Sequence, residues 1–109
     1  ISVDLPRDGV RAVRAAQQTG GQYLTVSDEE IISAIGEQGK YGIFTEPAGA
    51  TAYAGLKKAI NMGYILSDDP VVVINTGNGL KDIKAAMMAV NPAPVIEPTM
   101  SSLKKYLKI

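Results

Sequence analysis

The feature that most constrains this 109-residue chain is an apolar run that breaks into a glycine-spaced turn. The β-branched residues 71–74 predict a strand buried on both faces, as in parallel sheets covered by helices. The turn that follows contains Thr76, and an amphipathic segment starts at Leu80. In open α/β sheets such a turn meets ligands, because free backbone N–H groups and the dipole of the next helix can bind an anion or a polar ring atom. The pattern predicts an α/β fold with a ligand site at this turn.

Composition excludes several classes of function. A hydrophobic content of 46% fits one domain with a modest core, and eleven basic residues balance eleven acidic ones, so neither nucleic acid nor a membrane is expected as a partner. No apolar run approaches the ~20 residues of a membrane span, and no signal peptide is recognisable, which favours a cytoplasmic location. Cysteine and histidine are absent, so no thiol nucleophile, histidine base or metal site is expected.

The spacing of apolar residues predicts several helices joined by extended segments. Ser27 and Glu30 have the spacing of a capping box, Pro47 suits a first helical turn, and Thr99 can cap a short last helix. The expected helices cover about 7–19, 28–39, 47–61, 80–90 and 100–108, with strands at 22–26 and 71–74. Val10 and Val13 give the first segment its helical spacing. The expected inward or apolar-face residues of the other helices are Ile31, Ile32, Ile35, Leu80, Ile83, Ala86, Met87, Val90, Leu103 and either Tyr106 or Leu107.

Two features of the helix expected at 47–61 are open to two interpretations. Its first half is built from alanine and glycine, which suits close helix packing or the approach of a flat ligand. Glu46 precedes it, either as a simple N-terminal anchor or as a polar group directed into a site. Two strands are too few to cover so many helices, and the chain starts at Ile1 without a lead-in, so residues 1–109 are expected to be one piece of a larger three-layer α/β domain.

Two motifs and their separation resemble the C-terminal part of the threonine synthase family. They are Gly42-Ile43-Phe44-Thr45-Glu46-Pro47-Ala48-Gly49-Ala50 and Val71-Val72-Val73-Ile74-Asn75-Thr76-Gly77-Asn78-Gly79-Leu80-Lys81-Asp82. The segments 1–6, 20–21 and 26–30 are similar as well, so the likeness extends to about Ile96. The resemblance implies the C-terminal portion of the large domain of a tryptophan-synthase-like fold, with helices around a mostly parallel sheet.

The same resemblance implies a pyridoxal-phosphate lyase of threonine biosynthesis that converts O-phospho-L-homoserine and water to L-threonine and phosphate. It implies that the hydroxyl of Thr76 hydrogen-bonds the pyridine nitrogen and that Gly77 lets the turn approach the ring. Asn78 and Glu46 complete the expected cofactor-binding set, with Asn78 shaping the loop and Glu46 on the cofactor side of the pocket. Residues 1–6 would approach the substrate.

Other parts of the family pattern do not occur in residues 1–109. The Schiff-base lysine and the loop that binds the cofactor phosphate have no counterpart, and Lys81 is expected to form a surface ion pair beside Asp82. The sequence therefore predicts no catalytic residue here, and a chain that alone is inactive and binds pyridoxal phosphate poorly.

Three hypotheses stay open at this point. The first is a C-terminal fragment of threonine synthase, with the remainder of its own chain, a small-molecule substrate and a second copy in a homodimer as partners. The second is a sister enzyme on the same scaffold, such as cysteate synthase or an amino-acid dehydratase. The third is a free-standing module that binds a small ligand or a partner protein.

Overall fold

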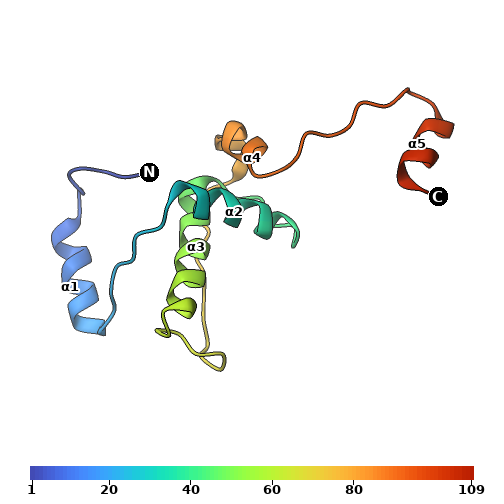
Figure 1. The fold of residues 1–109 in the computed structure, drawn as a ribbon. Helices are drawn as coiled ribbons and strands as arrows, with labels where there is room; N and C mark the ends of the chain where they lie inside the picture. Colours follow the sequence, from blue (N-terminus) through green and yellow to red (C-terminus); the bar gives the residue numbers. More distant parts are fainter.

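Two helices packed against each other, α2 and α3, form the centre of the molecule in a computed structural model that describes residues 1–109 (Figure 1). A third, short helix, α4, packs against α2. The helices in chain order are α1 (Gly9–Thr19), α2 (Asp28–Gly39), α3 (Pro47–Asn61), the 3₁₀ turn η1 (Gly79–Lys81), α4 (Ile83–Met88) and α5 (Met100–Leu107).

The core lies where the apolar stripe of α2 meets the small residues of α3. Ile31 and Ile35 are buried, as the sequence predicts, whereas Ile32 is only partly buried. They pack in one cluster with Ala50 and Ala54 of α3 and Ala85 of α4. Side chains this small let two helix backbones approach closely, so the close-packing interpretation of the alanine-rich segment is confirmed for its buried face.

Three helix starts follow their local sequence. Ser27 and Glu30 form the predicted capping box, with the Glu30 N–H donating to Ser27 and the Ser27 N–H donating to the Glu30 carboxylate. Pro47 occupies the first turn of α3, and the Thr99 hydroxyl accepts from the Ser102 N–H at the start of α5. The caps at Ser27 and Thr99 satisfy backbone groups that a helix end leaves free, and Pro47 has no N–H that would need a partner.

The first and last helices contain no buried residue, which corrects the inward face predicted for the last one. Val10 is 76% exposed, and Leu103, Tyr106 and Leu107 are all exposed. Figure 1 shows α1 and α5 standing away from the central helices at opposite ends of the molecule. The spacing of their apolar residues predicts that a helix forms, but it does not predict whether another element packs against that helix.

Neither predicted strand forms. Residues 22–26 and 71–74 are extended, but they belong to no strand, and the backbone groups of residues 71–76 exchange no hydrogen bonds with other backbone groups. A strand is defined by its ladder to a neighbour, and residues 1–109 place no second strand beside either segment. The three-layer sandwich therefore stays a prediction, and residues 1–109 form a helical arrangement.

The helix expected over 80–90 is shorter than predicted. The Asp82 carboxylate accepts from the Ala85 N–H and so starts α4 one turn later, after the 3₁₀ turn. Of the predicted inward residues, Leu80, Ile83, Met87 and Val90 are exposed, and Ala86 is half-buried. The cap at Asp82 overrides the longer apolar pattern.

The molecule is extended as a whole. Its radius of gyration is 18.5 Å, whereas a compact domain of this length has roughly 13 Å. None of the helices has the length and apolar composition that a membrane span requires.

Candidate functional site

The glycine-spaced turn is held against the start of α3. The Glu46 N–H donates to the Gly77 carbonyl at 3.0 Å, and the Gly79 N–H donates to the Phe44 carbonyl at 3.1 Å. These bonds form a single antiparallel bridge between Thr45 and Asn78. Helix α3 and an exposed connection over residues 62–70 separate the two segments in the chain, so the motifs singled out in the sequence meet in space.

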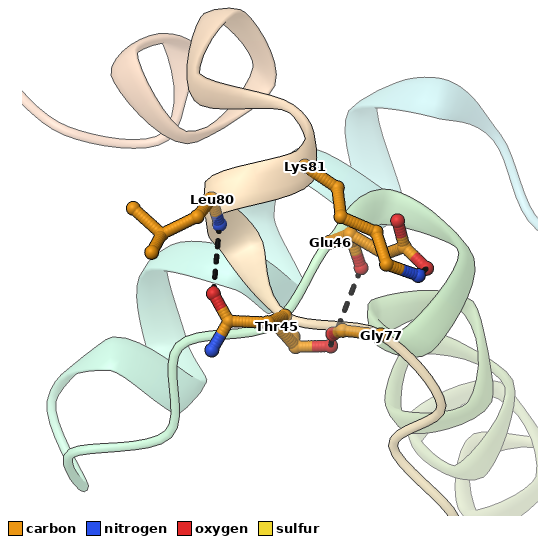
Figure 2. A network of polar contacts seen from close by, with 6 residues as sticks. Thr45, Glu46, Gly77, Leu80 and Lys81 are labelled. Carbon is orange, nitrogen blue, oxygen red and sulfur yellow. Dashed lines mark hydrogen bonds and ion pairs between the residues drawn. The ribbon is translucent and has the colours of Figure 1, made fainter.

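Buried side chains brace the turn on both sides of Thr76. The Thr45 hydroxyl donates to the Gly77 carbonyl at 3.1 Å, and Thr45 is only 1% exposed (Figure 2). The Gln38 side-chain amide donates to the Asn75 side-chain carbonyl at 3.0 Å, and Gln38 is 3% exposed. Thr76 itself is exposed and takes no part in these bonds.

Two glycines allow this close approach. A Cβ on Gly49, in the first turn of α3, would lie 3.3 Å from the Thr76 nitrogen and 3.5 Å from the Gly77 nitrogen, and would overlap the Thr45 hydroxyl. A Cβ on Gly77 would overlap the Glu46 carboxylate. The turn therefore lies directly on the start of α3, with the Thr76 side chain on its exposed side.

Glu46 pairs with Lys81, for which the sequence predicts Asp82 as the partner. Its carboxylate is 18% exposed and forms an ion pair with the Lys81 ammonium at 3.0 Å (Figure 2). The predicted partner of Lys81, Asp82, caps α4 instead, so Lys81 does form an ion pair, but across 35 residues. Glu46 makes no side-chain cap on α3, which favours the site interpretation of this residue over the anchor.

Asn78 shapes the loop, because its side-chain carbonyl accepts from the Leu80 N–H at 2.9 Å. A hollow of about 430 Å³ opens beside the turn, and its lining includes Glu46, Lys81 and Ile1. Thr76, Gly77 and Asn78 are not among the lining residues. The structure therefore brings the four predicted residues into one neighbourhood but divides them between the hollow and the turn.

Sequence reasoning missed Gln38 and the role of Thr45. Gln38 lies on the buried stripe of α2, in register with Ile31, Ala34 and Ile35, and a polar residue at such a position is a usable signal. Thr45 carried no comparable signal, because its partner is a carbonyl 32 residues away. No group of three or more acidic, histidine or cysteine residues is placed to hold a metal ion.

Comparisons with known proteins find relatives that match most of this chain. Threonine synthase of Methanocaldococcus jannaschii is 42% identical over 109 residues, covering 99% of this chain and 27% of that protein. Threonine synthase of Mycobacterium bovis is 43% identical over 99 residues, covering 87% and 28%, and that of Halalkalibacterium halodurans is 39% identical over 99 residues, covering 90% and 28%.

The chain thus spans about a quarter of the length of these curated relatives. The family model described as "Pyridoxal-phosphate dependent enzyme" matches residues 1–77, which include both α3 and the turn as far as Gly77. This chain belongs to the pyridoxal-phosphate dependent enzyme family.

Proposed function

We propose that this chain is part of a threonine synthase, a lyase that converts O-phospho-L-homoserine and water to L-threonine and phosphate. The observation that carries the proposal is the identity of 42% with a threonine synthase along almost the whole chain. The contact between the start of α3 and the turn supports it, because it joins the two motifs on which the resemblance rests.

The residues of this chain suit one edge of the cofactor. Thr76 offers an exposed hydroxyl on a turn whose other side is packed against Gly49. The chain offers no matching place for the cofactor phosphate, and Lys81, the lysine of this site, is engaged with Glu46. We therefore assign a ring contact to residues 1–109, and place the phosphate-binding loop and the Schiff-base lysine in other parts of the complete protein.

Pyridoxal phosphate, when bound, supplies an electron sink for reactions at amino-acid carbon atoms. The role of Thr76 is to hydrogen-bond the pyridine nitrogen through a neutral hydroxyl, which, unlike a carboxylate, does not hold a proton on that nitrogen. Gly77 keeps the turn free of a side chain near the ring, and Asn78 keeps its shape through Leu80. Glu46 holds Lys81 beside the hollow through their ion pair.

The test is the product of the complete gene, assayed with pyridoxal phosphate for phosphate release from O-phospho-L-homoserine. We expect activity in the wild type and a loss of roughly 10- to 100-fold in kcat/KM for Thr76→Ala, since one hydrogen bond to a buried polar partner is worth about 1–3 kcal/mol. Thr76→Ser keeps the hydroxyl and should retain most of the activity.

Residues 1–109 expressed alone serve as the negative control and should neither release phosphate nor bind the cofactor firmly. A complete protein that binds pyridoxal phosphate but acts only on unphosphorylated hydroxy amino acids would replace this proposal with a dehydratase. A complete protein that does not bind the cofactor at all would remove both assignments.

A further inference from the structure

We propose that Gln38 and Thr45 are positioning residues that fix the direction of the Thr76 hydroxyl. The inference rests on the proposed function, because it concerns the turn assigned to the cofactor ring. Neither residue faces the exposed side of the turn. Both act on the residues that immediately flank Thr76.

Thr45 fixes the residue after Thr76. Its hydroxyl lies 3.1 Å from the Gly77 carbonyl and 3.3 Å from the Glu46 carbonyl and donates to the nearer one, and the Glu46 N–H donates to the same Gly77 oxygen at 3.0 Å. The carbonyl of Gly77 thus receives two donors from consecutive residues at the start of α3. Two donors on one oxygen restrict rotation of a peptide plane more than one does, which fixes the plane between Gly77 and Asn78, one residue after Thr76.

Gln38 holds the side chain of the residue before Thr76 from a different helix. Its amide nitrogen reaches Asn75 at 3.0 Å from the buried face of α2, while its own Oε1 is buried without a hydrogen-bond partner. An unpaired buried oxygen destabilises a fold, so an apolar side chain would serve the α2 core better. The feature that the glutamine adds at this position is the bond to Asn75.

The two bonds act in combination with the packing beneath the turn. The Thr76 nitrogen lies just above Gly49, so the backbone cannot move towards α3. With the Asn75 side chain bonded to Gln38, the Gly77 carbonyl bonded to two donors and α3 below, the turn presents the Thr76 side chain on its exposed side. This arrangement limits the orientations of its hydroxyl before any ligand arrives, and such preorganisation favours binding.

The test uses the complete gene product, with pyridoxal 5′-phosphate as the probe and its absorbance titrated to give a dissociation constant. Thr45→Val keeps the shape of the side chain and removes the donor, and Gln38→Met keeps the length and removes both the donor and the unpaired oxygen. We expect each variant to bind the cofactor about tenfold more weakly, which corresponds to about 1.4 kcal/mol. Thr45→Ser should recover most of the loss.

Two readouts separate positioning from a merely structural role. The first is the melting temperature without cofactor, which for Gln38→Met should be unchanged or higher while binding weakens. The second is a double-mutant cycle with Thr76→Ala, in which the effects of Thr45→Val and Gln38→Met on binding should largely disappear. Thr51→Val is the matched control, because its hydroxyl also donates to a backbone carbonyl, that of Pro47 at 2.8 Å, but within α3.

The outcomes distinguish the inference from the proposed function. If Thr76→Ala weakens binding but Thr45→Val and Gln38→Met bind like the wild type, the positioning role is wrong and the proposed function stands. Losses that track a lower melting temperature, or that persist in the Thr76→Ala background, also overturn it. A wild-type protein that does not bind pyridoxal phosphate overturns the positioning role together with the proposed function.

Discussion

At the scale of single residues, the candidate site depends on small groups placed beside charged or polar ones. Gly77 lies against the Glu46 carboxylate with no room for a Cβ, and Glu46 in turn holds Lys81. The ion pair is largely shielded on the Glu46 side, which is 18% exposed. A change at Gly77 should therefore reach Lys81 through the carboxylate between them.

Gly77→Ala should destabilise the complete protein and weaken binding of pyridoxal phosphate. The added methyl group must displace the Glu46 carboxylate, which breaks its contact with Lys81. Because the displaced atoms belong to a flexible and partly exposed side chain, we expect a loss of under about 1 kcal/mol in the free energy of unfolding, the usual range for a surface ion pair. Chemical unfolding followed by circular dichroism measures the first effect, and a cofactor titration measures the second.

Gly55→Ala is the matched control. A Cβ on Gly55 meets nothing within 4 Å, and alanine in a helix interior is more favourable than glycine by about 0.5–1 kcal/mol. This variant should be as stable as the wild type or more so, with unchanged cofactor binding. Equal stability of the Gly77 and Gly55 variants would contradict the tight contact at the turn.

The residue scale also shows where sequence reasoning succeeds. The meeting of Glu46 with the glycine-spaced turn could be expected from the resemblance, because both motifs belong to one site there. The bond from Gln38 to Asn75 could not, since it depends on the distance between α2 and the turn in the folded chain. Contacts between distant segments are fixed by packing, which periodicity does not encode.

At the scale of elements, helices with a cap or a first-turn proline were predicted well, at Ser27, Pro47 and Thr99. These signals lie within a few residues of the helix start and need no tertiary partner. The segment over 80–90 shows the opposite case, because the carboxylate of Asp82 starts a new helix inside the expected one. Strands 22–26 and 71–74 failed for a third reason, which is that a strand requires a neighbour that periodicity cannot supply.

The pairing of α2 with α3 should weaken in acid. The pKa of the Glu37 carboxyl lies below its ordinary value of 4.5 because the Lys57 ammonium hydrogen-bonds to it. A carboxyl whose pKa is lower in the folded chain stabilises the fold above its unfolded pKa, and this contribution disappears as the pH falls through the folded pKa. Both side chains are partly exposed, so the effect should stay under about 1 kcal/mol.

Helix content of residues 1–109, followed by far-ultraviolet circular dichroism during thermal melting, measures this effect between about pH 6 and about pH 3. Glu37→Gln should melt earlier than the wild type near neutral pH and lose part of the acid dependence. Glu97→Gln, in the exposed segment before α5, is the control and should follow the wild type. An acid dependence that Glu37→Gln leaves intact would assign the effect to other carboxyls.

At the scale of the whole molecule, the chain leaves most of its apolar residues uncovered. Only 11 of 109 residues are buried, whereas Val72 is 88% exposed and Val95 is fully exposed. Residues 71–76 also present free backbone N–H and C=O groups. Exposed apolar surface and unpaired extended backbone both favour association.

Residues 1–109 on their own should therefore associate at micromolar concentrations rather than remain monomeric. The measurement is sedimentation equilibrium, supported by the fluorescence of a dye that binds apolar surface. Val72→Lys and Ile74→Lys place charges on the exposed extended segment and should reduce the associated fraction, as charged residues do on edge strands. A stable monomer with little dye binding would contradict this prediction.

The bonds between the start of α3 and the turn also bear on where the length of the chain can vary. They close a loop whose far side is the exposed connection over residues 62–70. The entropic cost of closing a flexible loop grows only with the logarithm of its length, by about 0.6 kcal/mol for each doubling. Extra residues there would leave the site almost unaffected, whereas one inserted between Thr45 and Pro47 would shift the Thr45 hydroxyl relative to the Glu46 N–H. Extra residues in the connection over 62–70 are thus compatible with the site. Extra residues at the start of α3 are not.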